Sequence, residues 1–177
     1  MPAVLLNGGI STVVIRDNAV IGTDGVETTG HVYGAGQGVN PYEVAYTYES
    51  DATKPSRMVS GNTWEYFADE AAYLQFVETL ALTGKTDVTI DETATIKGSV
   101  FGGSESGFVY HDTDVKIKNG TILGDAFGGG RGLASFAEAG RVSGNTNIAI
   151  SDGAVQGNIY GGGNRGDVGT IKKNADY

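Results

Sequence analysis

Three side chains at one recurring position of the sequence carry the oxygen atoms that a calcium ion prefers. Asp87, Asp114 and Asn147 each follow a threonine and precede a valine or isoleucine. If these segments stack on one another, the two carboxylates repel each other, and a bound Ca²⁺ would relieve the repulsion. The alternative is that Asp and Asn begin a strand by hydrogen-bonding to their own backbone at a turn. The second interpretation is favoured, because the spacing lacks the Gly-Gly-x-Gly-x-Asp nonapeptide of calcium-loaded β-rolls, and no metal or other cofactor is predicted.

A tripeptide of the integrin-binding type, Arg165-Gly166-Asp167, lies in a glycine-rich segment that predicts an exposed corner. Its two charged side chains would carry the recognition. However, Gly166 also belongs to a Gly-x-Val motif that recurs at Gly107 and Gly140 with different neighbours. A structural role for this glycine is therefore favoured over recognition.

One aromatic residue recurs at a further fixed position, as Tyr33, Phe101, Phe127 and Tyr160. In a regular strand the preceding residue, Val100 for example, points to the opposite face, so a buried valine would leave the rings outside as a strip for sugar stacking. A corner at the glycines that follow would turn both side chains inward. Interior stacking is favoured, because rings stacked in a core gain burial and offset-stacking energy.

Motifs of catalysis and nucleotide binding fail on their sequence context. Gly161-x-Gly163-x-x-Gly166 has the spacing of a dinucleotide-binding turn, but no helix is predicted after it. His31 and His111 fall at different positions of the repeat with no third ligand, which favours solvated surface residues over a metal or catalytic site. No catalytic or cofactor-binding residue is predicted, and the chain is not expected to be an enzyme.

These candidate residues belong to an internal repeat. Residues 113–130 align without a gap with residues 146–163, an offset of 33 (146 − 113), and related copies begin near residues 11 and 86. Equivalent positions form columns of β-branched residues, which are Val13, Val88, Val115 and Ile148, then Ile15, Ile90, Ile117 and Ile150, then Val20, Ile96, Ile122 and Val155. The first two columns stand two residues apart, so they share one face of a strand. Each copy therefore predicts a strand with one buried face.

Glycine marks the predicted corners between strands. A glycine follows the second strand of every copy, and a glycine cluster follows each recurring aromatic residue. We interpret these glycines as positions where φ > 0 lets the chain turn. A unit of short strands cannot bury its own apolar face, so the copies must stack, about 4.8 Å apart. The predicted fold class is mainly β, a parallel β-solenoid (β-helix) of about four coils.

An insertion interrupts the repeats. Residues 1–38 form the first coil, residues 39–85 the insertion, and residues 86–177 three further coils of the same solenoid domain. Near residues 63–83 apolar side chains recur at helical spacing, which predicts an amphipathic helix, with Phe67, Ala71, Leu74, Val77 and Ala81 on its apolar side. We expect the whole to be a fragment of a longer protein.

Charge and composition exclude several classes of partner. The 177 residues include 12 Lys and Arg against 21 Asp and Glu, a formal net charge of −9, which disfavours nucleic acid and anionic lipid. No apolar run is long enough to insert into a membrane, and the first residues lack the positive region of a signal peptide. With no cysteine, neither a disulfide nor a thiolate metal site can form.

The motifs Thr86-Asp-Val-Thr-Ile and Lys97-Gly-Ser-Val-Phe-Gly-Gly, together with the preceding Leu80-Ala-Leu-Thr, resemble glycine-rich β-solenoid repeats of large adhesin-like surface proteins of anaerobic gut bacteria. The resemblance covers roughly residues 60–170. It implies a β-solenoid architecture and an extracellular, cell-surface location, with signal and anchor outside this sequence. The expected partner is a host glycan or a host protein. Because the motifs are structural, it implies no active site.

The expected function is a non-catalytic structural or adhesive module of a bacterial cell-surface protein, which displays loops or acts as a rigid spacer. One alternative is a polysaccharide-binding or polysaccharide-degrading β-helix, which needs acidic and basic residues converging on one strand face, whereas only Lys97 and Lys116 are found. Another is a self-assembling fibre segment, because strand edges at the end of a solenoid can pair end to end.

Overall fold

The computed structural model describes residues 9–26, 29–38, 56–60, 63–66, 82–134 and 138–169. Within these ranges the chain is mainly β and contains no helix. Accordingly, none of the described residues forms a helix long and apolar enough to cross a membrane.

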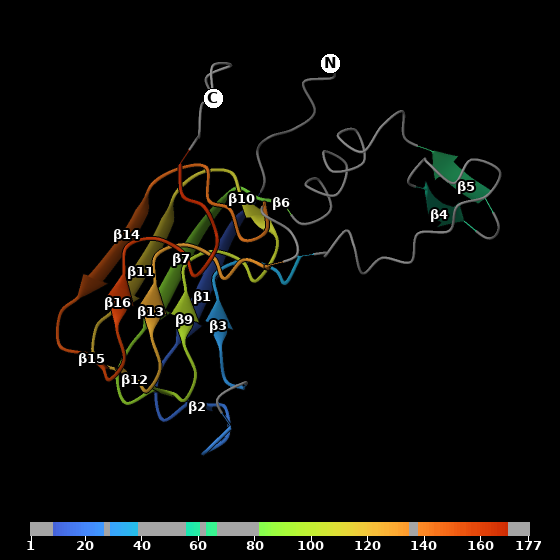
Figure 1. The fold of residues 1–177 in the computed structure, drawn as a ribbon. Helices are drawn as coiled ribbons and strands as arrows, with labels where there is room; N and C mark the ends of the chain where they lie inside the picture. Colours follow the sequence, from blue (N-terminus) through green and yellow to red (C-terminus); the bar gives the residue numbers. More distant parts are fainter. Residues whose placement is uncertain are drawn as a thin grey trace.

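Four repeats each supply one strand to each of three parallel sheets (Figure 1). Repeat 1 consists of β1 (Ile10–Ile15), β2 (Val20–Ile21) and β3 (Val32–Tyr33). Repeat 2 consists of β7 (Lys85–Ile90), β8 (Thr95–Ile96) and β9 (Val100–Phe101). Repeat 3 consists of β11 (Thr113–Ile117), β12 (Thr121–Ile122) and β13 (Ala126–Phe127). Repeat 4 consists of β14 (Thr146–Ile150), β15 (Ala154–Val155) and β16 (Ile159–Tyr160).

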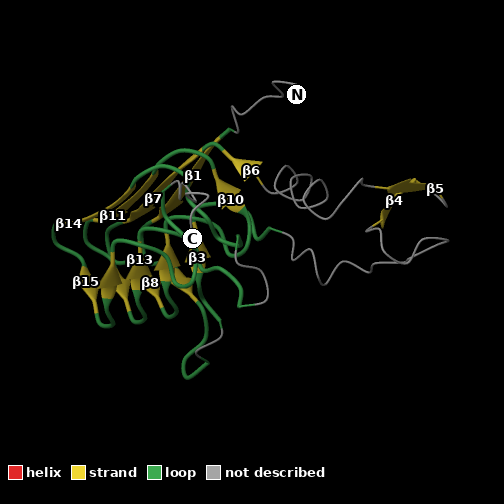
Figure 2. Cartoon of the chain, turned by 45° about the horizontal axis from the view of Figure 1, so that its top comes forward, coloured by secondary structure: helices red, strands yellow, loops and turns green. Residues whose placement is uncertain are grey.

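The sheets stack the repeats in sequence order. The first sheet has the order β1-β7-β11-β14, the second β2-β8-β12-β15 and the third β3-β9-β13-β16. Figure 2 shows these strands in yellow with the connecting loops in green between them. The register matches the first two sequence columns, since Val88 pairs with both Val13 and Val115, and Val115 pairs with Ile148. In the third column the prediction is wrong at Val20, which is exposed, because Ile21 is the residue that pairs with Ile96. Parallel strands in stacked sheets are compatible with the predicted β-solenoid.

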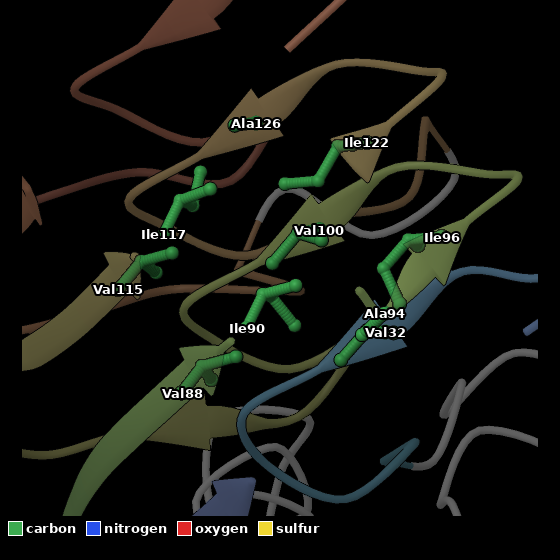
Figure 3. Close-up of a cluster of buried hydrophobic side chains, with 10 residues drawn as sticks. All are labelled: Val32, Val88, Ile90, Ala94, Ile96, Val100, Val115, Ile117, Ile122 and Ala126. Carbon is green, nitrogen blue, oxygen red and sulfur yellow. The ribbon is translucent and has the colours of Figure 1, made fainter. Parts of the chain in front are cut away.

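The core lies between the three sheets. Burial alternates along β7, so that Val88 and Ile90 are fully buried whereas Asp87 and Thr89 face outward. Ten buried side chains from repeats 1 to 3 meet there (Figure 3), namely Val32, Val88, Ile90, Ala94, Ile96, Val100, Val115, Ile117, Ile122 and Ala126. Each Val or Ile buried in this way stabilises the fold by about 1.5–3 kcal/mol relative to an exposed side chain.

The glycine clusters are required by close stacking of backbones. A Cβ on Gly102 would lie 2.2 Å from the carbonyl oxygen of Gly128, and a Cβ on Gly128 would lie 2.4 Å from the carbonyl oxygen of Gly161. None of these three glycines has a positive φ, whereas Gly22 does, at 104°. The interpretation of the clusters as positive-φ corners is therefore wrong, and what each layer needs there is the absence of a side chain.

A column of threonines closes the layers formed by repeats 2, 3 and 4. The hydroxyl groups of Thr86, Thr113 and Thr146, at the start of the first-sheet strands, donate hydrogen bonds to the carbonyl oxygens of Gly102, Gly128 and Gly161. Thr86 and Thr113 are buried. Each bond joins the first sheet to the end of the third strand of the same repeat, so it fixes the cross-section of that repeat.

A smaller set of pairings runs beside the main stack. Strand β6 (Leu82–Thr83) pairs in parallel with β10 (Phe108–Val109), and isolated bridges continue from Val109 to Val142 and from Val142 to Val168. Phe108 and Ala139 are buried there, with Leu82 and Leu133 packed against them. These contacts secure the segments that connect one repeat to the next.

The helix predicted near residues 63–83 is wrong at both of its ends. Strand β5 (Thr63–Tyr66) pairs antiparallel with β4 (Ser56–Ser60), and β6 occupies the other end. The sequence Thr-Trp-Glu-Tyr of β5 is rich in residues that favour strands, and this preference outweighs the helical spacing. Residues 67–81, which hold most of the predicted apolar stripe, lie outside the described residues.

Candidate functional site

The proposed calcium ligands lie side by side on the outer face of the first sheet. Asp114 is in register with Asp87 on one side and with Asn147 on the other. Between the two carboxylates lies the side chain of Lys116, whose Nζ is 2.9 Å from Asp87 Oδ2 and 3.0 Å from Asp114 Oδ2. Asn147 Nδ2 donates to Asp114 Oδ1 at 2.9 Å. An ammonium group therefore occupies the position that a cation between the carboxylates would take.

Electrostatics at this cluster favour the charged forms. Burial raises the pKa of Asp114, but hydrogen bonds from Lys116 and Asn147 outweigh it, so the net pKa is lowered. Hydrogen bonds to Asp87 and then Asp114 raise the pKa of Lys116. Lys116 was not among the predicted ligands, although its position two residues after Asp114 places it on the same face of the strand. Over the described ranges, no three His, Cys, Asp or Glu side chains are grouped so that they could hold a metal ion.

The recurring aromatic residues form a ladder of nearly parallel rings. Ring centroids are 5.0 Å apart from Tyr33 to Phe101, 4.8 Å from Phe101 to Phe127 and 4.8 Å from Phe127 to Tyr160. Phe101 and Phe127 are buried, and so is Val100 on the core side of the same strand. Because each inner ring has its two faces against other rings, a sugar has no ring face to stack on in repeats 2 and 3. Tyr160 is exposed.

A polar network spans three repeats beside this ladder. Arg131 Nη1 donates to Glu105 Oε1 at 2.8 Å and to the hydroxyl oxygen of Tyr33 at 3.2 Å. The Tyr33 hydroxyl in turn donates to Glu105 Oε1 at 3.5 Å, and burial raises the pKa of Tyr33. Arg131 and Tyr33 are 98 positions apart in the sequence, and no sequence motif predicts the contacts of this network. The ion pair of Arg131 with Glu105 joins repeats 3 and 2, and the hydrogen bonds of the Tyr33 hydroxyl join repeat 1 to both.

His31 is part of the packed structure. Its Nδ1 accepts a hydrogen bond from the backbone N–H of Ser99 at 3.0 Å, and its ring lies edge-on to Phe101 and Tyr33. Burial, and then the charge of Arg131, lower the pKa of His31, so the neutral imidazole is favoured. The prediction of a solvated surface histidine is wrong for His31, whereas His111 is exposed.

The tripeptide Arg165-Gly166-Asp167 lies in repeat 4 with both charged residues exposed. Arg165 adopts a positive φ of 70°, and the backbone carbonyl of Asp167 accepts a hydrogen bond from the N–H of Val142. A Cβ on Gly166 would lie 2.5 Å from the carbonyl oxygen of Gly140. The glycine is thus needed for stacking, and the two charged side chains flank it at the surface.

Lys97 and Lys116, the basic residues considered for polysaccharide cleavage, do not converge. Lys97 follows β8 of the second sheet, and its Nζ is 2.6 Å from Asp24 Oδ1, at a shallow pocket lined by both residues and by Leu123. Lys116 lies on the first sheet and forms ion pairs with Asp87 and Asp114. No model of a known protein family, no curated protein and no solved structure gives a significant match to this chain.

Proposed function

We propose that the stacked sheets are a β-solenoid that serves as a non-catalytic structural or adhesive module, a rigid spacer with loops displayed along its side. The observation that carries this proposal is the continuity of three parallel ladders through four repeats. Backbone hydrogen bonds, buried β-branched columns and the ring ladder all run in the same direction. A load applied along that direction would be shared by every ladder.

The side loops support a display role. Residues 131–141 join repeat 3 to its Gly-x-Val motif by a longer path than residues 105–108 do in repeat 2, while the three sheets keep the same register on both sides. Loop length is therefore uncoupled from the geometry of the stack. Variation in the loops, including the exposed Arg165 and Asp167, would change what the module binds without changing the scaffold.

The pairing of charges supports a role without catalysis. Lys116 is paired with Asp87 and Asp114, and Arg131 with Glu105. Charged side chains engaged in this way hold neighbouring repeats together. The resemblance of the repeats to adhesin-like surface proteins supports a location on the bacterial cell surface, where a spacer would hold a binding surface away from the envelope.

The proposal is tested by binding and turnover measured on the same preparation. We expect the chain to leave acidic polysaccharides intact, and to bind host glycans or host matrix proteins on an array through its loops. Replacing Arg165 and Asp167 together by Ala tests the exposed tripeptide, with Lys118→Ala and Asp152→Ala as a control pair of exposed charges. New chain ends in a polysaccharide, abolished by Lys97→Ala or Lys116→Ala, would overturn the proposal in favour of the degrading β-helix.

A further inference from the structure

Repeat 4 presents side chains that the inner repeats bury. Ile150, Ile159 and Tyr160 are 40%, 53% and 44% exposed, whereas their equivalents in repeat 3, which are Ile117, Ala126 and Phe127, are 0%, 0% and 5% exposed. Among the described strands, β14, β15 and β16 each pair on one side only. This edge combines apolar side chains, an open ring face and unpaired backbone groups, which are the features of an unfilled strand interface.

Repeat 1 presents the opposite edge of the same columns. Within the described part of the chain, β1, β2 and β3 pair only with β7, β8 and β9. The columns that end at repeat 4 as Ile148, Ile150, Val155 and Tyr160 begin at repeat 1 as Val13, Ile15, Ile21 and Tyr33. An apolar or aromatic residue of one edge therefore has a counterpart of the same kind at the other.

We propose that repeat 4 of one molecule docks on repeat 1 of a second copy of this chain, in the parallel register that joins the repeats within one molecule. This junction places Tyr33 of the second copy on the open face of Tyr160, and Ile15 on Ile150. Because the two surfaces differ and the contact does not close on itself, further copies add in a row. The junction is independent of the proposed spacer function, which a single molecule can also fulfil.

Asparagine side chains of repeat 4 keep this edge free of unpaired carboxylates at three positions. Asp112, Asp114 and Asp125 of repeat 3 each accept a hydrogen bond from the side-chain amide of the aligned asparagine, which is Asn145, Asn147 or Asn158. Repeat 4 thus places neutral amides, which both donate and accept hydrogen bonds, over these three carboxylates of repeat 3. By the internal register, Asn147 would meet Thr12 of the second copy. No carboxylate of these columns is left unpaired at the junction, which avoids the cost of burying a charge.

The glycine column supplies a steric test of the register. A Cβ on Gly34, Gly102 or Gly128 would lie 2.1–2.4 Å from the carbonyl oxygen of the equivalent glycine in the following repeat. A Cβ on Gly161, in repeat 4, meets nothing within 4 Å. In the proposed junction that Cβ would collide with the carbonyl oxygen of Gly34 in the second copy. Gly161→Ala therefore leaves the fold undisturbed and blocks the junction.

The experiment is sedimentation velocity of the full chain over a wide concentration range at low and high salt. We expect assemblies that grow with concentration and with salt, because a net charge of −9 makes the copies repel until it is screened. Gly161→Ala should weaken association at least about tenfold while the melting temperature is unchanged. Thr89→Ala is the control, since β7 is already paired on both of its sides and Thr89 belongs to no contact of the junction.

A charge pair provides the second test. Val14 and Ala149 are exposed and stand at the two ends of one outward-facing column. Val14→Lys combined with Ala149→Lys places like charges at the junction, whereas Val14→Lys combined with Ala149→Glu places opposite charges there. We expect the second pair to associate at least about tenfold more tightly than the first. A chain that stays monomeric throughout, or association equal in all variants, overturns the junction.

Discussion

The hydroxyl group of Thr113 donates a hydrogen bond to the backbone carbonyl oxygen of Gly128, 15 residues further along the chain. The threonine begins a strand of the first sheet, and the glycine follows a strand of the third. The bond therefore closes the cross-section of one repeat, and Thr86 and Thr146 form the same bond in the repeats on either side.

Replacing this hydroxyl by a methyl group tests how much the closing bond stabilises the fold. Thr113→Val keeps the shape of the side chain and leaves the Gly128 carbonyl without this donor, so we expect the free energy of unfolding to fall by about 1–3 kcal/mol. Urea denaturation measures the change. Thr89→Val, on the outward face of β7, is the control and should change stability by less than about 0.5 kcal/mol. Equal effects of the two substitutions would show that the bond is unimportant.

A second prediction tests whether the fold needs glycine in this column because a Cβ would collide with the next repeat or because φ must be positive. Gly102→Ala places a Cβ 2.2 Å from the Gly128 carbonyl oxygen and 3.0 Å from Val115 Cγ2, so we expect a loss of about 3 kcal/mol or more, at the upper end for overpacked cores. Gly161→Ala, in the same column at repeat 4, should leave stability unchanged. Thermal denaturation of the two variants checks this, and equal melting temperatures would contradict the close-stacking explanation.

The cluster around Lys116 predicts a dependence of stability on pH. The pKa of Asp114 is lowered in the folded state, so its contribution is present above its ordinary value of 3.8 and is lost as the pH falls through the lowered value. Lys116→Met should cost about 1 kcal/mol near pH 7, since partly exposed ion pairs are worth about 0.2–1 kcal/mol each. The difference in the free energy of unfolding between Lys116→Met and the protein that retains Lys116 should become smaller as the pH falls. Lys118→Met, whose Nζ is 3.8 Å from Asp91 Oδ2, is the control, and a pH-independent difference would contradict the assignment.

Calcium is expected to leave the stability of the protein unchanged. The Lys116 ammonium already lies between the carboxylates of Asp87 and Asp114, and an incoming Ca²⁺ would have to displace it. Melting temperatures in millimolar Ca²⁺ and in excess chelator should therefore agree. A rise with Ca²⁺ that Asp87→Asn abolishes would instead establish this cluster as a calcium site.

His31 predicts a second pH effect, in a range closer to neutrality. Its pKa is lowered below the ordinary value of 6.5, so the folded state binds a proton less readily than the unfolded state. Stability should be fully present above about pH 6.5 and should fall as the pH drops through that value toward the lowered pKa. His31→Asn retains an acceptor for the Ser99 N–H and should remove this part of the dependence. The urea midpoint of unfolding is measured for the protein and for His31→Asn at about pH 7.5 and at about pH 5.5. An equal change in midpoint between the two pH values in both proteins would exclude His31 as the source.

The register of the sheets could be predicted from the sequence, whereas the roles of several residues could not. Val115 and Ile148 stand in gap-free copies of one motif, and such an alignment specifies which residues pair in a parallel stack. Alternation at intervals of two also identifies the outward position of Asp114. The prediction of positive-φ corners at the glycine clusters is wrong, because composition alone does not distinguish a positive φ from a forbidden Cβ.

Contacts made across long separations carried no signal in the sequence. The bond between Arg131 and Tyr33 depends on the lengths of the loops between three repeats, which set how the side chains meet. The ring ladder was ambiguous because a strand of two residues, such as β9, is too short for alternation to decide which face is buried. At residues 63–66, helical spacing competed with strand preference, and pairing with β4 decided between them.

The forbidden Cβ positions at Gly102 and Gly128 also constrain how such a molecule can evolve. A turn can absorb an inserted residue, since Thr86 and Gly102 are 16 residues apart and Thr113 and Gly128 are 15 residues apart while the glycines stay aligned. A whole layer can also be duplicated or deleted with every column preserved. The length of the stack would therefore change in steps of about 4.8 Å, which is the spacing of neighbouring strands. The number of repeats encoded in a gene would then set the length of the stack.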